Sequence, residues 1–270
     1  MKIYALSVVK NEADVIEANL KAASKWADKI FVWDNGSTDG TWEKIQALAD
    51  DIITPWKQDA RPFRDSLRSM LYNAHKHWGK PGDWWCIKLD ADEFYYDDPR
   101  QFLAKIPLKY HYVCSRYIQL MITEEDIAEY QFTGSFEEDR EKINYFHKLA
   151  WAEIRFVRHR DRLAWTEKTP FPEHVGIVYP ELITMLHYQH RSPQQIQRRL
   201  TQRKEAIAKG GYHSPHITQS HWREVLRHRK DLYHLKEGID LHTIPAENKY
   251  LHQPHKLFIK RLLHGLKILP

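Results

Sequence analysis

The sequence predicts an α/β fold, in which a mostly parallel central sheet is flanked by helices and followed by an α-helical C-terminal appendage. Short apolar runs alternate with segments of helical spacing over residues 1–98. This alternation is typical of parallel strands that are joined by crossover helices. From residue 192 onward, basic segments with helical spacing replace the strand-like runs, and these predict the appendage.

The first part of the chain contains four apolar runs, each of which ends at turn residues or acids. The run at 3–9 stops at a polar triplet, and the run at 29–33 ends in a cluster of turn residues before helical spacing resumes. We expect strands at 3–9, 29–33, 52–55 and 84–89 and helices at 14–26, 42–48 and 61–78.

The elements after residue 98 are expected to be shorter and more varied. A polar, acidic stretch at 123–144 predicts a loop or an excursion over the sheet, and Ser192-Pro193 predicts the start of a helix. We expect helices at 99–106, 192–209, 218–236 and 255–269, with Gly210-Gly211 ending the second, and strands at 110–120, 148–158, 163–165 and 175–179. A further apolar run ends at residues 185–188.

The composition of the 270 residues is that of a globular protein with a sizeable core, because 42% are hydrophobic and 13% aromatic. The formal charge of +5 is a mild excess. Cys86 and Cys114 lie in apolar stretches without metal-ligand spacing, which suits a reducing cytoplasm. No signal peptide or membrane-spanning run is recognisable. We therefore expect a soluble, cytoplasmic protein, attached at most to a membrane surface.

Acidic residues follow two of the predicted strands. Asp90 and Asp92 end the apolar run at 84–89, and on an extended chain they would point the same way. Paired carboxylates repel each other unless a cation lies between them, and Mg²⁺ or Mn²⁺ would bridge them to phosphate oxygens. Asp34 follows the strand at 29–33, so all three are expected in one crevice at the carboxyl ends of the strands. The alternatives are solvated strand ends and ordinary turn residues.

Three motifs in register resemble the family 2 glycosyltransferases of the GT-A fold: VVKNEADVI, VWDNGSTDGT and LDADEF. The last motif is similar to that of a bacterial subgroup with D-x-D-E-F. The resemblance implies a nucleotide-diphosphate-sugar donor, with UDP the commonest nucleotide, and a Mn²⁺ or Mg²⁺ ion held by Asp92. It implies nucleotide contacts from Val9, Asn11, Glu12, Asp34 and Asp90 and from an arginine in the preceding helix, Arg64 or Arg68. Those arginines could equally form a solvated helix face paired with Asp65.

The resemblance covers roughly the first hundred residues, and the change to basic helical segments at Ser192 predicts a division of the chain. Residues 1–190 would form the GT-A domain, with a nucleotide-sugar half at about 1–98 and an acceptor half at about 99–190. Residues 191–270 would form the helical C-terminal region.

The acceptor half holds two further candidates. Glu173, in a Pro-containing bend, is our candidate for the base that takes the proton from the acceptor hydroxyl, with Glu153 and Asp161 as weaker choices. His187 ends an apolar run and is our candidate for completing the metal site, although a core or capping hydrogen bond is nearly as good an interpretation. Trp151 and Trp165 could be sugar platforms, with core packing as the alternative.

The C-terminal stretch at 255–269 separates basic from apolar residues. Lys256, Lys260, His264 and Lys267 share one helical face, and Phe258, Ile259 and several leucines form the other. Such a helix suits an anionic membrane surface. Packing of the apolar face on the domain is the alternative.

These features and the resemblance together predict a metal-dependent glycosyltransferase that acts on an oligosaccharide or lipid-linked glycan in lipopolysaccharide or capsule biosynthesis. Inversion at the sugar carbon is what the resemblance implies. A sugar-phosphate nucleotidyltransferase would need a glycine-rich loop after the first strand, which Val8–Glu12 lacks. A nucleic-acid-binding protein would use the basic tail, but its charges follow no recognition motif, so no nucleic-acid partner is expected. A sugar-binding module would not need the three acids at strand ends.

Overall fold

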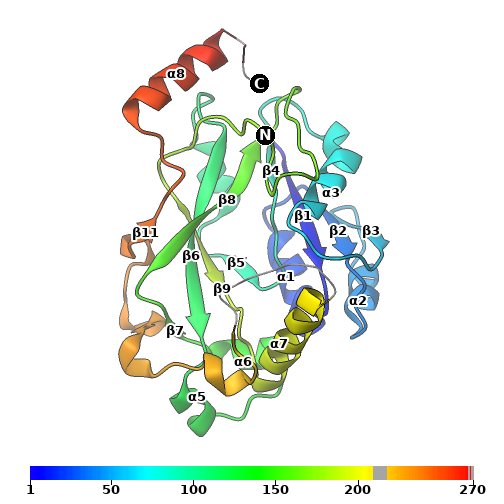
Figure 1. The fold of residues 1–270 in the computed structure, drawn as a ribbon, viewed down its shortest axis with the longest axis vertical. Helices are drawn as coiled ribbons and strands as arrows, with labels where there is room; N and C mark the ends of the chain where they lie inside the picture. The colour runs from blue at the N-terminus through cyan, green and yellow to red at the C-terminus, as the bar shows by residue number, and fades with distance from the viewer. Residues whose placement is uncertain (209–217, 267, 269–270) are drawn as a thin grey trace.

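The computed structural model describes residues 1–208, 218–266 and 268 of the chain. A long, twisted sheet runs through the molecule in the order β10-β7-β6-β8-β4-β1-β2-β3, with β5, β9 and β11 attached at its side (Figure 1). The predicted α/β fold, with a central sheet flanked by helices and a helix at the C-terminus, is confirmed.

The first half of the sheet is wholly parallel. It consists of β1 (Ile3–Val9), β2 (Lys29–Asp34), β3 (Ile53–Gln58) and β4 (Trp84–Cys86), which pair β1 with β2, β1 with β4 and β2 with β3. The crossovers contain α1 (Ile16–Ala23), α2 (Thr41–Ala47) and α3 (Leu67–His75), the last continued by a short 3-10 helix, Lys76–Trp78.

The second half of the sheet is mixed. Its long strands are β6 (Tyr112–Met121), β8 (Ala150–Arg158) and β9 (Ile183–His187), and its short ones are β5 (Glu93–Tyr95), β7 (Tyr145–Phe146), β10 (Tyr233–His234) and β11 (Ala246–Glu247). β8 runs antiparallel to both β4 and β6, and so joins the two halves. β5 pairs with β9 through Glu93 and His187, which brings residue 187 beside the turn that contains Asp92.

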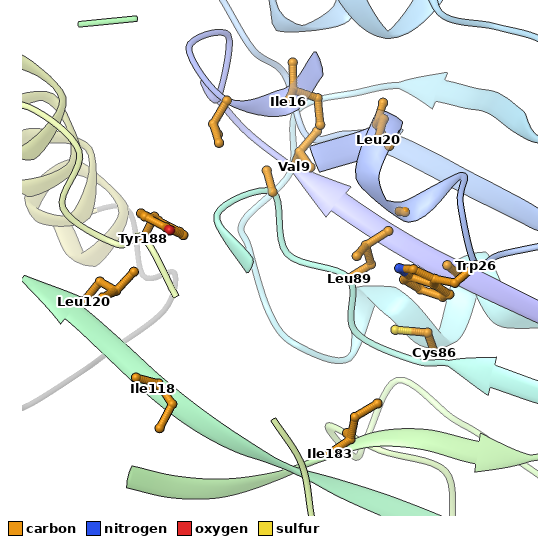
Figure 2. Packing of buried hydrophobic residues seen from close by; sticks show 14 of the residues in the cluster. Val9, Ile16, Leu20, Trp26, Cys86, Leu89, Ile118, Leu120, Ile183 and Tyr188 are labelled. Carbon is orange, nitrogen blue, oxygen red and sulfur yellow. The ribbon is translucent and has the colours of Figure 1, made fainter. Parts of the chain in front are cut away.

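Strand β1 has alternating side chains that enter two different cores. Ile3, Ala5 and Val9 pack with α1, whereas Leu6 and Val8 pack on the face that α3 covers. Alternation of this kind follows from the two-residue period of a strand. Figure 2 shows the first core, where Val9, Ile16, Leu20 and Leu89 meet between β1 and α1. The central strands are therefore buried on both sides and leave only their ends for chemistry.

Three sequence expectations for loops and strands are wrong. The stretch at 123–144 is not a plain loop, since it forms α5 (Glu124–Glu129), α6 (Phe136–Asp139) and a short 3-10 helix, Arg140–Lys142. A capping box between Thr123 and Asp126 starts α5. The stretch at 163–165 is irregular, and at 175–179 the only strand pairing in the described chain is a bridge from Val178 to Tyr112.

Two helix expectations also need correction. α3 begins at Leu67 rather than 61, after Pro62 in an irregular segment. Residues 218–236 contain 3-10 turns at Trp222–Val225 and Arg229–Asp231 and strand β10 instead of an α-helix. There, tertiary contacts replace helical hydrogen bonds: Glu124 donates its backbone N–H to Arg227, and Arg229 pairs with Asp126 at 2.7 Å.

The remaining helices agree with the sequence. α4 (Pro99–Ala104) follows β5, α7 (Pro193–Ala208) follows β9, and α8 (Pro254–Gly265) ends the described chain apart from residues 266 and 268. Short 3-10 turns, Leu235–Glu237 and Leu241–Thr243, precede α8. The predicted stop at Gly210-Gly211 and the end of the last helix at Lys267 and Leu269 lie outside the described residues.

Candidate functional site

The predicted acidic site residues lie at the point in the sheet where the order of the parallel strands reverses. From β1 the chain adds β2 and β3 on one side and then returns to place β4 on the other. A crevice opens at such a reversal, outside the carboxyl ends of the strands. Asp34 ends β2, and Asp90 and Asp92 follow β4, so the three predicted acids lie at this edge.

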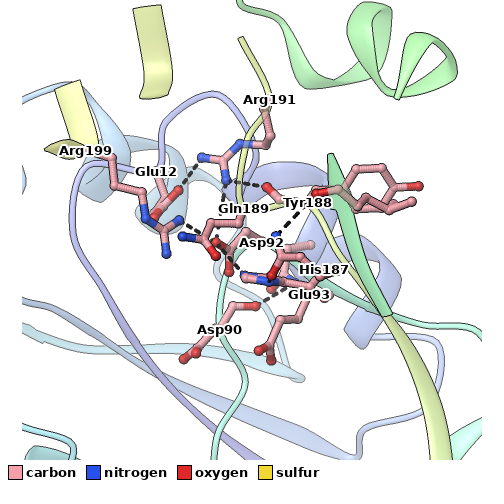
Figure 3. Close-up of polar contacts among 12 residues, drawn as sticks. Glu12, Asp90, Asp92, Glu93, His187, Tyr188, Gln189, Arg191 and Arg199 are labelled. Carbon is pink, nitrogen blue, oxygen red and sulfur yellow. Dashed lines mark hydrogen bonds and ion pairs between the residues drawn. The ribbon is translucent and has the colours of Figure 1, made fainter. Parts of the chain in front are cut away.

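Asp92 lies at the centre of a cationic group that comes from the far end of the chain. Its Oδ2 accepts a hydrogen bond from Arg199 Nη1 at 2.6 Å and lies 3.2 Å from His187 Nε2 (Figure 3). Arg191 Nη1 lies 3.8 Å away. Burial raises the pKa of Asp92, but His187, Arg199 and Arg191 outweigh it and hold the pKa well below its ordinary value. Asp92 is therefore a buried anion.

Asp90 has a separate set of partners. Its carboxylate accepts a hydrogen bond from Arg68 and lies 3.5 Å from Lys88 Nζ. Burial raises its pKa, but Arg68, Lys88 and Arg155 lower it to about 2. The expectation that Asp90 and Asp92 point the same way is wrong, because β4 ends at Cys86 and Asp92 lies in a turn. Each carboxylate is therefore neutralised by its own cations.

Arg191 ties the segment after β9 to the loop after β1. Its guanidinium is almost fully buried, pairs with Glu12 and bonds Asp14 Oδ2 at 2.7 Å, and its Nη1 donates to the Tyr188 carbonyl at 3.0 Å. Glu12 thus already has a cationic partner. In Figure 3, Arg191 lies between Glu12 and the Asp92 group, so the two acidic segments share one arginine.

His187 is oriented by Gln119. The Gln119 amide nitrogen donates to the Leu120 carbonyl at 3.2 Å, so its Oε1 faces His187 Nδ1, 2.8 Å away, and that nitrogen must donate. Burial lowers the pKa of His187, despite the opposing effect of Asp92. When the ring is protonated, Nε2–H donates to Asp92; when it is neutral in this tautomer, the Nε2 lone pair faces Asp92, the orientation that a cation shared by the two side chains needs.

Asp92 and His187 fit a divalent cation as two neighbouring ligands. The 3.2 Å between Oδ2 and Nε2 is close to the ~3 Å between adjacent ligands of a six-coordinate ion with bonds of about 2.1 Å. The described residues include no group of three or more histidines, cysteines or acids that could hold a metal. Further ligands would therefore be phosphate oxygens and water, as Mg²⁺ commonly has. Arg199 shares the same Asp92 oxygen and would have to give way.

A buried ion-pair network supports the D-x-D-E turn from below. Arg155 on β8 donates to Glu93 Oε1 at 2.6 Å and to Glu153 Oε2 at 2.8 Å. Lys88 Nζ bonds the other oxygen of Glu153 at 2.8 Å, and Arg155 Nη1 reaches the Lys88 carbonyl at 3.3 Å. These bonds fix the backbone of residues 88–93 to β8.

The candidate nucleotide-binding residues near β1 and β2 form hydrogen bonds with the backbone of the loops that follow these strands. Asp34 is fully buried; its Oδ1 accepts the backbone N–H groups of Gly36 and Ser37 at 2.9 and 2.7 Å. Its Oδ2 is buried without a hydrogen-bond partner among the described residues, and such an atom suits a ligand donor. Asn11 has a positive φ of 55° and accepts from the Thr38 N–H at 2.8 Å, while Val9 accepts from Asn35 through its carbonyl.

The two candidate arginines before Asp90 differ in position. Arg68 is buried on α3 and bridges Asp90 and Asp65, the latter at 2.8 Å. Arg64 is exposed in the segment before α3. Arg68 is therefore the arginine that the fold brings to the acids.

The candidate base lies in the long connection between β8 and β9. Glu173 is half-buried, and its Oε1 accepts from Thr166 Oγ1 at 3.1 Å. Phe171 of the same connection borders a cavity of about 230 Å³ together with Arg68, Lys88 and Glu153. Asp161 is exposed.

The two candidate platforms differ in exposure. Trp165 is buried in the α3-side core, so its predicted alternative of core packing is confirmed. Trp151 on β8 is 46% exposed.

Sequence reasoning missed Lys88, Arg155, Arg191 and Arg199. Arg155 alternates with Glu153 in an otherwise apolar strand, a pattern that signals a buried charge with a neighbouring partner. Arg191 follows shortly after His187. Arg199 gave no signal, because it lies in a basic run that is typical of a solvated helix face.

Comparison of the sequence with models of known protein families finds a matching family. The sequence model of glycosyl transferase family 2 matches residues 5–150. No curated protein matches the chain. Among the described residues, the helices are all too short or too polar to cross a bilayer.

Proposed function

Because the chain belongs to glycosyl transferase family 2, we propose that it is a metal-dependent, inverting hexosyltransferase of the bacterial D-x-D-E-F subgroup. Family membership makes the chain a glycosyltransferase with a nucleotide-sugar donor and an acceptor. In our proposal the donor is a UDP-sugar, and the acceptor is an oligosaccharide or lipid-linked glycan of lipopolysaccharide or capsule biosynthesis. The observation that carries this proposal is the placement of His187 Nε2 3.2 Å from Asp92 Oδ2.

Donor binding is assigned to the carboxyl ends of β1, β2 and β4. Asp34 offers its unpartnered Oδ2 to the base or ribose, and Asp90 offers a carboxylate beside Arg68. Val9, Asn11 and Glu12 would form the adjoining wall, while Arg64 is too exposed to be preferred over Arg68.

The diphosphate would lie between two cationic groups. Arg68 and Lys88 adjoin Asp90, and Arg191 and Arg199 adjoin Asp92. Charge-assisted hydrogen bonds from such side chains stabilise the charge that develops on a leaving diphosphate. Asp92 and His187 would hold Mn²⁺ or Mg²⁺, which when bound supplies Lewis-acid stabilisation of that leaving group.

Glu173 is the proposed general base. Its competitor Glu153 is bound by Lys88 and Arg155. Burial raises the pKa of Glu153, but Arg155 and Lys88 lower it to about 2, so this carboxylate is a poor proton acceptor near neutral pH. Glu173 Oε1 accepts a hydrogen bond from the neutral Thr166 hydroxyl, and its loop borders the cavity beside Arg68.

Attachment to the inner face of the cytoplasmic membrane is the proposed setting. α8 extends from one end of the molecule (Figure 1), and none of its residues is buried. Phe258 is 70% exposed, and Ile259 and Leu262 are each 52% exposed, while Lys256 and Arg261 supply positive charge. An amphipathic basic helix with an uncovered apolar face suits an anionic bilayer.

Calorimetric titration with UDP, with and without Mn²⁺, tests the site. We expect wild-type binding that weakens at least about tenfold on chelation and in Asp92→Asn, which keeps the shape of Asp92 and removes its charge. Lys204→Gln on the exposed side of α7 is the matched control. Equal UDP affinity with and without metal would contradict the metal assignment. Failure to bind any nucleoside diphosphate would contradict the donor site itself.

A further inference from the structure

A second cavity adjoins the Asp92 site on the side of β6 and β8. Its volume is about 390 Å³, at the small end of the range for ligand pockets and suited to a sugar unit rather than a long chain. The side chains of chemical interest in its wall are Gln119, His147, Trp151, His190, Arg203 and Arg227.

The cavity shares residues with the proposed metal site. Gln119 lines the cavity and also accepts the hydrogen bond of His187 Nδ1. Arg203 lies four residues after Arg199 on α7, so the two side chains point in similar directions about one helical turn apart. A group in the cavity would therefore be a short distance from the reacting centre at Asp92.

The wall of the cavity is positively charged. Its described lining contains two arginines, Arg203 and Arg227, and no aspartate or glutamate. Burial lowers the pKa of His147 and, more strongly, that of His190. These rings are thus neutral near pH 7 and serve as hydrogen-bonding groups rather than charges. Within the described structure, His190 Nδ1 is buried and has no hydrogen-bond partner.

Trp151 adds an aromatic surface to the same wall. It lies on β8 with nearly half its surface exposed, and its ring centre is 6.1 Å from that of His147, edge to face. An exposed tryptophan next to polar groups is an effective surface for the apolar face of a sugar ring.

We propose that this cavity is an acceptor subsite for an anionic sugar, one that carries a carboxylate or a phosphate group. Trp151 stacks on the ring, Arg203 and Arg227 bind the anion, and His190 and Gln119 contact hydroxyl groups. The inference rests on the proposed transferase function, which it deepens by giving the chemical class of the acceptor. The positive charge of the described lining favours an anionic acceptor over a neutral one.

Saturation-transfer NMR with three small probes tests the subsite: methyl β-D-glucuronide, glucose 6-phosphate and the neutral methyl β-D-glucoside, each with UDP and the diamagnetic ion Mg²⁺ present. We expect an anionic probe to bind about tenfold or more tightly than the glucoside, the ratio for one good charged contact. Preference between the two anionic probes then identifies the group as carboxylate or phosphate. Equal binding of all three probes would overturn the proposal.

Variants separate this subsite from the donor site. Arg203→Gln and Arg227→Gln should each reduce the preference for the anionic probe while UDP affinity stays at the wild-type value. Trp151→Ala should weaken all three probes together, and Lys204→Gln should change nothing. Anion preference that survives both arginine substitutions would refute the assignment. If wild-type protein binds no UDP but still prefers the anionic probe, the transferase proposal fails and the anion subsite stands.

Discussion

Arg155 Nη2 donates to Glu93 Oε1 at 2.6 Å, and the two side chains are 0% and 1% exposed. Glu93 belongs to the strand that follows Asp92, and its other carboxylate oxygen has no hydrogen-bond partner in the described chain. Breaking a buried pair leaves an uncompensated charge, which costs far more than the pair itself contributes. The Arg155–Glu93 pair therefore holds the acidic turn in place, and removal of either side chain alone should be strongly destabilising.

Arg155→Met should lower the free energy of unfolding by about 3–5 kcal/mol, since Glu93 loses its cation inside the protein. Urea denaturation measures the loss. Glu17→Gln, which breaks the exposed Glu17–Lys21 pair, is the control and should cost less than about 0.5 kcal/mol. The double variant Glu93→Gln, Arg155→Met should recover part of the loss. Similar losses for Arg155→Met and the control would contradict the importance of burial.

Arg199→Gln should tighten the binding of Mn²⁺ in the absence of nucleotide. Arg199 occupies the Asp92 oxygen that the cation needs, so its removal eliminates a competitor; a gain of about threefold to tenfold corresponds to one charged hydrogen bond of modest net strength. Electron paramagnetic resonance of free Mn²⁺ gives the affinity, with Lys204→Gln as the control. Weaker Mn²⁺ binding in Arg199→Gln would show that the arginine assists the cation instead.

Glu173→Gln should abolish transfer and leave UDP affinity unchanged, because the amide cannot take the acceptor proton. Glu153→Gln should keep the chemical step but reduce stability, since Lys88 and Arg155 lose a carboxylate partner. Product formation in a single turnover, together with UDP titration, distinguishes the two variants. Substantial transfer by Glu173→Gln would place the base elsewhere in the acceptor half.

His242 should stabilise the fold at mildly acidic pH. A hydrogen bond to Asp97 and a second to Asp240 raise its pKa above the ordinary value of 6.5, against the opposing effect of burial. The stabilisation is therefore complete below the unfolded-state pKa and disappears as the pH rises through the higher folded-state pKa. His242→Asn should be less stable than wild type near pH 5.5 and nearly equal near pH 8.5, as measured by denaturant midpoints. A constant difference across that range would argue against the ionisation.

Deletion of residues 255–270 should release the protein from anionic liposomes, as measured by co-sedimentation. The exposed apolar face of α8 supplies burial in the bilayer, and its lysines supply attraction that salt should weaken. Vesicles of neutral lipid are the control and should retain much less protein. Unchanged sedimentation of the shortened protein with anionic vesicles would refute the membrane role of α8.

The strands of the parallel half of the sheet could be predicted from the local pattern of apolar residues. The apolar run at 3–9 matches β1 residue for residue, and the acids after β2 and β4 lie at one edge because parallel topology requires it. The orientation of Asp90 and Asp92 was not predictable in this way, since the strand ends at Cys86 and a turn intervenes.

The features that could not be predicted from the sequence depend on contacts between residues far apart in the chain. Arg199 bonds Asp92 across 107 positions in the chain, and nothing local distinguishes it from its basic neighbours on α7. The error at 218–236 has the same origin, because contacts of Arg227 and Arg229 with α5 override a helical pattern. Within a basic helix such as α7, an arginine that pairs with a buried carboxylate has the same local sequence pattern as its solvated neighbours.

The placement of Arg191 and Arg199 after β9 also matters for engineering. The matched family region ends at residue 150, yet the arginines that neutralise Asp92 and bind Glu12 come from residues 191–199. A chimera that exchanges only the first 150 residues with a relative would join one protein's carboxylates to another's counter-charges. The exchangeable unit therefore extends at least through α7.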